Sequence, residues 1–279
     1  MTDAGEGLSS SMAVRQVSAA LAAAGLESPE ADARTLVSFA CGLPFGQLGF
    51  GGGLTADQQR ILDQAVAERL RGKPLQHITG QAHFRTISVH VGPGVFIPRP
   101  ETEILAGWAI AQIKPDWRVV ELCAGSGAIS LAIAAEAKPA QQWALERSPE
   151  AFQYLLQNLE GTSIWPVQAD MLDGLLELNG TIDLVVANPP YLAFGAPLAS
   201  DVLHDPAEAL FCGPDPLAAI GIVTGVARRL LKPGGVLGCE HGDDQADQVC
   251  AIFARAGFVD ISAHQDLTGR ARFVVARLS

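Results

Sequence analysis

The sequence has no long run of uncharged apolar residues, no Cys-x-x-Cys pair and no excess of basic residues. Without about 18 consecutive apolar residues, no transmembrane helix and no membrane association are expected. The first twelve residues lack the basic segment that begins a secretory signal, which favours a cytoplasmic protein. The five cysteines are far apart and no histidine cluster accompanies them. We therefore expect reduced thiols and no bound metal.

Positive charge is scarce throughout the chain. It holds 19 Lys and Arg against 30 Asp and Glu, a formal net charge of −11. Residues 1–80 carry six basic and eight acidic residues, net −2, and residues 81–279 carry thirteen and twenty-two, net −9. Affinity for nucleic acid comes largely from Lys and Arg that neutralise phosphates. We therefore expect no stable nucleic-acid binding.

The N-terminal part has the pattern of a helical bundle. Apolar residues recur at three- and four-residue spacing from Met12 to Leu43 and again from Thr55 to Arg71. Thr55 is a favourable residue for beginning the second of these stretches, because its hydroxyl can cap a helix. The pattern predicts a small helical domain over residues 1–80.

After residue 80 the pattern changes to alternation. Apolar residues alternate from Phe84 to Val91 and return at 95–97, which predicts a β-hairpin linker over residues 81–98. From residue 99 to residue 279, short apolar strands alternate with helices. The strands are expected at 118–122, 142–145, 164–167, 182–187 and 236–239, with a closing antiparallel strand at 273–276. The helices are expected from Ala128, from Pro149, and over 216–231 and 245–256. Such alternation is typical of a Rossmann-like α/β domain whose sheet is covered on both faces.

A glycine-containing turn follows the first strand of this domain. The strand ends in Glu121 and Leu122, and Cys123 and Ala124 lead into Gly125 and Gly127 before the helix. Small residues at such a turn let a ligand approach the backbone and the helix N-terminus. Taken alone, a Gly-x-Gly pair is equally consistent with a structural turn.

Two carboxylates follow the next strands. Glu146 comes about 20 residues after the glycines, where an acid can bind both ribose hydroxyls of a nucleoside. Ser130 stands where the third glycine of a dinucleotide fingerprint would be, so a nucleoside without pyrophosphate is favoured. Asp170 follows the third strand and is placed to accept the adenine amino group, although a solvent-exposed loop aspartate is an alternative interpretation.

The most specific motif is Asn188-Pro189-Pro190-Tyr191, directly after an apolar strand. Two consecutive prolines restrict the backbone and fix a rigid turn at the carboxyl end of that strand, the edge where α/β sheets bind ligands. The Asn188 side-chain oxygen and the Pro189 carbonyl can accept hydrogen bonds from a planar amide or amino group, and Tyr191 offers a ring for stacking. The alternative is a structural Asn-Pro turn.

This motif and the glycine turn are together similar to class I methyltransferases that alkylate planar nitrogens, which include DNA adenine enzymes and protein-glutamine enzymes. Residues 96–103, Phe-Ile-Pro-Arg-Pro-Glu-Thr-Glu, closely resemble the hallmark segment of the PrmC (HemK) family of release factor glutamine methyltransferases. The resemblance covers nearly the whole chain and includes residues 74–80, 206–210, 232–235 and 266–270.

The resemblance implies a seven-stranded methyltransferase domain that uses S-adenosyl-L-methionine and releases S-adenosyl-L-homocysteine. It implies methyl transfer to N5 of the glutamine in the Gly-Gly-Gln motif of peptide chain release factors, with residues 1–80 recognising the protein substrate. A monomer is expected. The catalytic residues would be Asn188, Pro189 and Tyr191, and Pro190 would join them in binding the substrate. The cofactor-binding residues would be Glu121, Cys123, Ala124, Gly125, Gly127, Glu146, Asp170 and Asn188.

Several positions leave alternatives open. Arg99, Glu101 and Thr102 either shape the cofactor pocket or form a structural ion-paired segment. Glu121, Cys123-Ala124 and His204-Asp205 depart from the residues usual in the family. We interpret His77, His204 and His241 as surface or loop histidines, and Cys123 as a packing residue.

Two other functions compete with this assignment. The first is methylation of an adenine N6 or another nucleic-acid amino group at the same Asn188–Tyr191 site, for which the sequence supplies no basic groove. The second is a non-catalytic module that binds a release factor.

Overall fold

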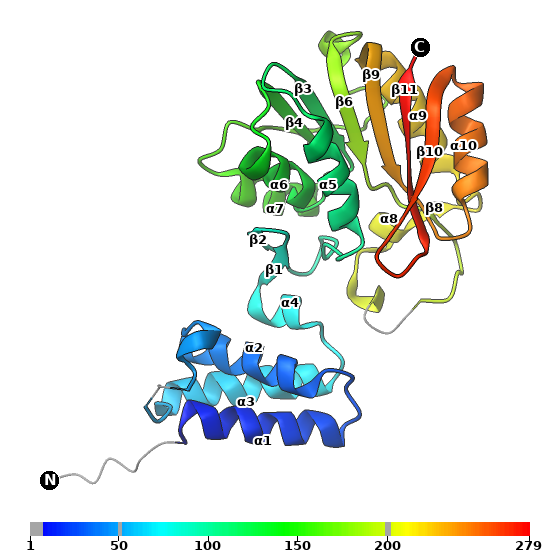
Figure 1. Cartoon of the computed structure of the whole chain (residues 1–279). Coiled ribbons are helices and arrows are strands. Elements are labelled where there is room, and N and C mark those ends of the chain that lie inside the picture. The colour runs from blue at the N-terminus through cyan, green and yellow to red at the C-terminus, as the bar shows by residue number, and fades with distance from the viewer. Residues whose placement is uncertain (1–7, 50–51, 199–201) are drawn as a thin grey trace, which may run out of the picture. The chain divides into compact units, whose positions relative to one another are not determined.

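The computed structural model describes residues 8–49, 52–198 and 202–279, which form two compact units (Figure 1). The first contains the described residues up to Gly80 together with residues 202–204. Its helices are α1 (Ser10–Ala23), α2 (Pro29–Cys41), α3 (Ala56–Leu70) and α4 (Leu75–Thr79), with 3-10 turns η1 (Phe45–Gln47) and η3 (Val202–His204). The helical periodicity from Met12 to Leu43 therefore corresponds to two helices, α1 and α2.

A capping box begins α3, as the sequence suggests. The Thr55 hydroxyl accepts the Gln58 backbone N–H at 3.2 Å, and the Gln58 side chain accepts the Thr55 N–H at 2.9 Å. The apolar faces of α1, α2 and α3 meet in one core that contains Leu21, Leu36 and Leu62. Burial of these faces holds the short helices together, because isolated helices of this length are marginal in water.

The second unit begins with a β-hairpin that is shorter than the predicted 81–98 segment. Strands β1 (Gln81–Phe84) and β2 (Ile87–His90) pair across a turn in which Arg85 has φ +51°. Residues 91–97 form no strand, and Val95 and Ile97 are instead buried in the core of this unit. The apolar residues that suggested a longer hairpin are thus core contacts of an irregular segment.

A seven-stranded sheet forms the centre of the second unit, as expected for a class I methyltransferase. The strand order is β10-β11-β9-β6-β3-β4-β5, and only β11 runs antiparallel to both of its neighbours. The strands are β3 (Arg118–Leu122), β4 (Gln141–Glu146), β5 (Trp165–Gln168), β6 (Ile182–Ala187), β9 (Leu231–Glu240), β10 (Phe258–Gln265) and β11 (Ala271–Leu278). The longer helices are α5 (Thr102–Gln112), α6 (Ala128–Glu136), α7 (Pro149–Leu159), α9 (Ala218–Leu230) and α10 (Ala246–Arg255). The remaining short elements are η2 (Leu176–Leu178), α8 (Ala207–Leu210) and the strand pair β7 (Leu192–Ala193) and β8 (Phe211–Gly213).

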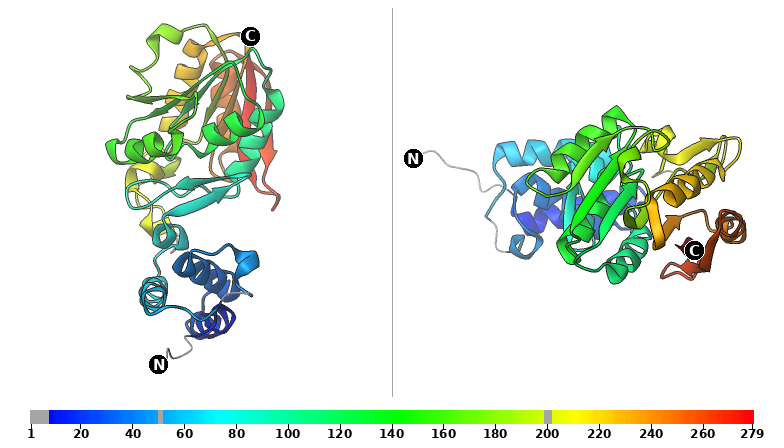
Figure 2. Two further views of the ribbon diagram at one scale, coloured as in Figure 1. Left: turned by 90° about the vertical axis from the view of Figure 1, so that its left-hand side faces the viewer. Right: turned by 90° about the horizontal axis from the view of Figure 1, so that it is seen from above.

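Helices cover both faces of this sheet, as Figure 2 shows. Successive strand residues point to opposite faces, so Val119 packs in the core with α5 and α6 while Val120 packs in the core with α9 and α10. Both valines are fully buried. The near-continuous apolar strands of the sequence therefore follow from burial on two sides.

Two of the longer elements of this unit were not predicted, nor were the short elements η2, α8, β7 and β8. Helix α5 has an apolar sequence without clear periodicity, and it packs Leu105 and Ala109 into the same core as the hairpin. Strand β10 lies at the edge of the sheet and most of its residues are partly or fully exposed, so it lacks the apolar pattern of a core strand.

Candidate active site

The carboxyl ends of the central strands lie level with one another. In the parallel pairings, Leu122 is opposite both Leu145 and Ala187, and Ala187 is opposite Cys239. The residues that follow these four positions therefore share one edge of the sheet. This is the edge where ligands bind in open α/β sheets.

The glycine turn between β3 and α6 has an unusual backbone. Cys123, Gly125 and Gly127 have φ values of +57°, +55° and +82°, in the left-handed region that favours glycine. A Cβ atom added to Gly127 would lie 2.6 Å from the Leu155 side chain. Glycine is thus required here both by conformation and by close packing of α6 against α7.

Glu146 is attached to this turn through its carboxylate. One oxygen, Oε2, accepts the Gly125 N–H at 2.8 Å, and Oε1 accepts the Ser148 N–H at 2.7 Å. Both contacts are to the backbone, so they fix the carboxylate at the end of β4 beside the glycines. Asp170 follows β5, accepts the Leu172 N–H at 3.0 Å and lies 3.6 Å from the Arg147 guanidinium. The structure thus brings the predicted ribose and adenine acids to adjacent strand ends.

Glu121 lies deeper than these acids. Its side chain is buried within the sheet and accepts the Ser130 N–H at 2.9 Å. Burial raises the pKa of Glu121 to about 8. Burial also raises the pKa of the neighbouring Cys123 thiol to about 12, so the thiol stays protonated and is not an activated nucleophile.

Asn188 and Tyr191 lie in the loop after β6. The Asn188 Nδ2 donates to the Thr102 hydroxyl at 3.3 Å, and Thr102 is the buried first residue of α5. The Gln245 side-chain amide donates to the Tyr191 carbonyl at 3.0 Å, which ties the loop to the start of α10. With Nδ2 directed to Thr102, the Asn188 Oδ1 is left to accept a hydrogen bond from a substrate.

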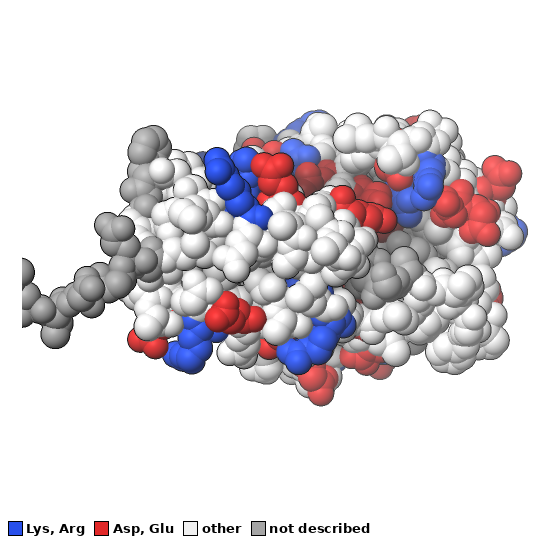
Figure 3. Space-filling model, turned by 90° about the horizontal axis from the view of Figure 1, so that it is seen from below, with Lys and Arg blue, Asp and Glu red and all other residues white. Residues whose placement is uncertain are grey.

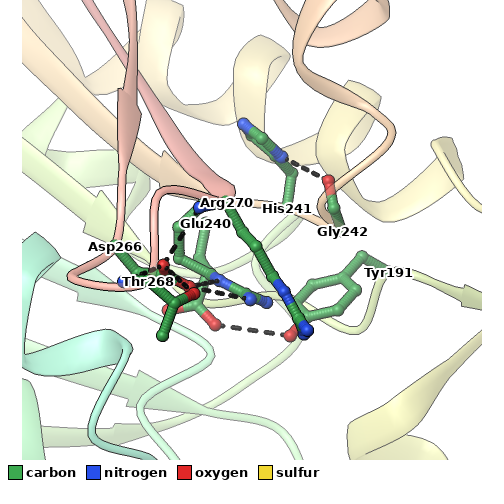
Figure 4. Close-up of polar contacts among 8 residues, drawn as sticks. Tyr191, Glu240, His241, Gly242, Asp266, Thr268 and Arg270 are labelled. Atoms are coloured by element: carbon green, nitrogen blue, oxygen red, sulfur yellow. Dashed lines mark hydrogen bonds and ion pairs between the residues drawn. The ribbon is translucent and has the colours of Figure 1, made fainter.

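Tyr191 also contacts a buried acid that sequence reasoning missed. Its hydroxyl donates to Glu240 Oε1 at 3.4 Å, as Figure 4 shows. Glu240 is the last residue of β9, next to the strand that carries Asn188. A polar residue that ends a buried apolar strand at this edge is the signal that could have identified it.

Arg99, by contrast, has a clear structural partner. It forms an ion pair with Asp205, and the Asp205 carboxylate also accepts the Ile97 backbone N–H at 3.1 Å. The Arg99 guanidinium stacks over the Phe96 ring at 5.3 Å. These contacts fix the segment that leads to Thr102. Arg99 therefore has a structural role in this segment.

The interpretation of the three histidines as surface or loop residues was wrong for His77, which lies in helix α4, whereas His241 does lie in the loop after β9. His77 and His241 are buried, and His204 is exposed. His241 follows Glu240, and its Nδ1 lies 2.7 Å from the Gly242 carbonyl. Burial lowers the pKa of His241. The sequence does not show that these two side chains are buried. His77 lies in a short helix and His241 follows a strand, and at both positions burial depends on how the chain packs.

Within the described ranges, no cluster of His, Cys, Asp or Glu could hold a metal ion. The same residues include no helix that is long and apolar enough to cross a membrane.

Comparison with known proteins identifies the family. A model of the PrmC N-terminal domain matches residues 12–80, and the model named conserved hypothetical protein 95 matches residues 75–204. The release factor glutamine methyltransferase of Mycolicibacterium smegmatis is 44% identical, over 95% of this chain and 96% of that protein. The chain belongs to the release factor glutamine methyltransferase family. The family expected from the sequence is thereby confirmed.

One relative of this family carries a different name. The 4-amino-L-phenylalanine/4-methylamino-L-phenylalanine methyltransferase of Streptomyces pristinaespiralis is 37% identical, over 88% of this chain and 87% of that protein. Among solved structures, a 16S rRNA methyltransferase from T. thermophilus in complex with AdoMet and guanosine matches with a TM-score of 0.52 at 19% identity, over 71% of this chain and 50% of that one. This likeness confirms the class I methyltransferase fold.

Proposed function

We propose that this protein transfers a methyl group from S-adenosylmethionine to N5 of the glutamine in the Gly-Gly-Gln motif of peptide chain release factors. Membership of the release factor glutamine methyltransferase family supports this function. The structural observation that carries it is the orientation of Asn188, whose Nδ2 donates to Thr102 so that Oδ1 can accept an amide N–H. The rigid Pro189 turn adds a backbone carbonyl as a second acceptor beside it.

An amide nitrogen is a weak nucleophile because its lone pair is delocalised. The site must therefore hold the nitrogen in line with the methyl donor and exclude water. Acceptors at Asn188 Oδ1 and the Pro189 carbonyl orient the two amide N–H groups and favour the positive charge that develops on nitrogen. The Tyr191 ring would stack on the substrate side chain.

The residues at the neighbouring strand ends suit a nucleoside cofactor. S-adenosylmethionine supplies the sulfonium methyl group when it is bound. The left-handed turn at Gly125 leaves the backbone open, because a Cβ atom built there would meet no atom within 4 Å. Glu146 beside this turn would accept the ribose hydroxyls, and Asp170 on the next strand would accept the adenine amino group. Glu121, Cys123 and Ala124 precede the glycines and would hold the turn in its conformation.

The helical unit, residues 1–80, is proposed to recognise the protein substrate. It carries exposed apolar side chains at Met12, Phe39, Phe45 and Leu70, which offer apolar contacts to a protein partner. Four of its six basic side chains form ion pairs with nearby acids, namely Arg34, Arg60, Arg69 and Lys73. One face of the molecule accordingly shows basic groups interspersed with acidic ones among uncharged surface (Figure 3). Such a surface suits a protein partner better than a phosphate backbone.

The alternative of nucleic-acid amino methylation is not favoured by family membership or by the net charge of −11. We further propose a cytoplasmic monomer that binds no nucleic acid stably. Pull-down with labelled oligonucleotides tests for nucleic-acid binding, and sedimentation of the purified protein tests for a monomer.

The decisive experiment is incubation of the purified protein with labelled S-adenosylmethionine and a purified release factor, followed by peptide mapping of the label. Label on the Gly-Gly-Gln glutamine is the expected result. Free 4-amino-L-phenylalanine and an adenine-containing oligonucleotide serve as competing acceptors, since the relative from Streptomyces pristinaespiralis is named for the first. Transfer to either acceptor with none to the release factor would overturn the proposal.

A further inference from the structure

Glu240 occupies a position beside the substrate site that the proposed reaction does not yet use. It ends β9, where Phe273 of β11 is its partner on one side and the preceding residue, Cys239, pairs with Ala187 of β6 on the other. Glu240 is thus level with Asn188 at the carboxyl edge of the sheet. Its side chain is only 2% exposed.

Glu240 contacts both halves of the substrate site. Its Oε1 accepts the Tyr191 hydroxyl at 3.4 Å. The Thr102 hydroxyl also interacts with the carboxyl group and favours its charged form, and the same hydroxyl accepts Asn188 Nδ2 at 3.3 Å. The carboxylate therefore reaches Tyr191 directly and Asn188 through Thr102.

A purely structural role does not account for this carboxylate. Its Oε2 is buried and has no hydrogen-bond partner among the residues that the structure describes. An unsatisfied buried charged oxygen costs more than an amide or an apolar group of the same size. A carboxylate at this position is therefore retained at a cost in stability, which points to a role in activity.

The charged groups around Glu240 come from β11 and from three loop segments. Arg272 of β11 attracts the carboxylate, and Glu101 before α5 repels it. Arg272 is held in place by Asp266, which accepts from its Nε and Nη2 at 3.3 and 3.1 Å. Asp266 is in turn fixed by the Thr268 hydroxyl and N–H and by the Arg270 N–H (Figure 4). His241 follows Glu240 in the chain, and its ring is engaged at Gly242.

We infer that Glu240 is a positioning residue, which holds Tyr191 directly and Asn188 through Thr102 in the geometry that orients the acceptor nitrogen. This inference rests on the proposed function for its effect on rate. As a carboxylate, Glu240 offers two acceptor oxygens, one of which accepts the Tyr191 hydroxyl, and protonation replaces one of these acceptors by a donor. Burial raises the pKa of Glu240 to about 7, so the arrangement changes near neutral pH. The rate of methyl transfer should rise with pH through this value.

The first test is Glu240→Gln in the full-length protein. A glutamine keeps one acceptor for Tyr191, but its NH2 group competes with Asn188 for the Thr102 oxygen. We expect kcat to fall by at least about tenfold, on the scale of losing a preorganised group, with the KM for S-adenosylmethionine within about twofold. The rise in kcat around pH 7 should disappear. Glu240→Asp, which keeps the carboxylate, should recover part of the rate and the pH dependence.

Asp183→Asn is the matched control. Asp183 is also a buried carboxylate, but it lies near the start of β6, at the opposite edge, where it accepts the Arg118 N–H and pairs with Lys232. Its substitution should lower thermal stability and leave the pH profile of kcat unchanged. A Glu240→Gln variant with kcat within twofold and an unaltered pH profile would overturn the inference.

A second measurement needs no substrate. The chain has two tyrosines, Tyr154 and Tyr191, so incorporation of 3-fluorotyrosine gives two fluorine resonances that Tyr154→Phe assigns. The Tyr191 resonance should titrate near pH 7 in the wild-type protein and not in Glu240→Gln. Absence of this titration in the wild type would contradict the coupling itself. Titration in a protein that does not methylate a release factor would instead overturn the proposed function and leave the coupling standing.

Discussion

Arg99 is ion-paired with Asp205, 106 residues further along the chain, and this pair joins the segment before α5 to the segment before α8. The Asp205 side chain is completely buried, and it also accepts the Ile97 N–H. The pair thus holds these two segments of the second unit together. Asp205 is bonded to two groups of the 97–99 segment.

Asp205→Ala should therefore destabilise the second unit strongly. The substitution leaves the Arg99 guanidinium and the Ile97 N–H without their acceptor, and breaking a buried pair costs about 3–5 kcal/mol. Chemical unfolding of the variant measures this cost. Asp260→Asn, which weakens the exposed Arg277 pair of the same unit, is the control and should change stability by less than about 1 kcal/mol. Equal effects of the two variants would contradict the buried role of Asp205.

Glu146→Ala should weaken binding of S-adenosylmethionine. The variant removes the proposed ribose acceptor and leaves the Gly125 and Ser148 N–H groups unpaired, so a loss of about 1–3 kcal/mol in binding is expected. Isothermal titration with S-adenosylhomocysteine measures it. Glu177→Ala, at an exposed glutamate, should leave the affinity unchanged. If Glu146→Ala binds the cofactor as well as the wild type does, the ribose assignment is wrong.

Glu121 should make stability depend on pH. Its pKa in the folded state is raised to about 8 from an ordinary value of 4.5, so the folded protein holds this proton more tightly than the unfolded chain. The stabilisation is complete below about pH 4.5 and is lost as the pH rises through about 8. Buried Glu240 acts in the same direction, with a pKa raised to about 7.

Urea unfolding between pH 5 and pH 8.5, without cofactor, tests this expectation. The free energy of unfolding of the wild type should fall as the pH rises, and Glu121→Gln should flatten much of the fall while keeping an acceptor for the Ser130 N–H. Glu177→Gln is the exposed control and should follow the wild type. A Glu121→Gln curve parallel to that of the wild type would show that the carboxyl group does not titrate as its burial requires.

Candidate site residues that come at the end of an apolar strand were recognisable from the sequence. The Gly125 and Gly127 turn, Glu146 and Asn188 each directly follow an apolar strand, and parallel pairing places strand ends at one edge. Glu240 and the pairing of Asp205 with Arg99 were missed because the residues that meet, Glu240 with Tyr191 and Asp205 with Arg99, are distant in sequence. No local pattern encodes which side chains meet once helix α5 packs beside the sheet.

The helical unit should be needed for the protein substrate and not for the cofactor. Its core residues form a cluster separate from those of the sheet, as Leu21 and Leu62 illustrate. Removal of residues 1–80 should abolish methylation of an intact release factor and leave S-adenosylhomocysteine affinity within a few-fold. Circular dichroism of the fragment checks that it is folded. Loss of cofactor binding in a folded fragment would contradict this division of labour.

Asn188→Ala should separate catalysis from binding of the cofactor. The side chain lies after the end of β6 and bonds to Thr102 at the edge of the sheet, so its loss should leave the fold and cofactor affinity nearly intact. The rate of methyl transfer should fall by about 10² or more, the scale for losing a preorganised stabilising group. Single-turnover transfer of labelled methyl to a release factor measures the rate.

Asn179→Ala provides the matched control, because Asn179 lies before β6 at the opposite edge and contacts Arg229 instead. Its rate should equal that of the wild type. A release factor whose target glutamine is replaced by glutamate should not be methylated by any variant, since a carboxylate has no N–H to donate and brings negative charge towards two acceptors. If Asn188→Ala retains the wild-type rate, the amide is oriented by other groups, and the assignment of Asn188 as the substrate-binding asparagine fails.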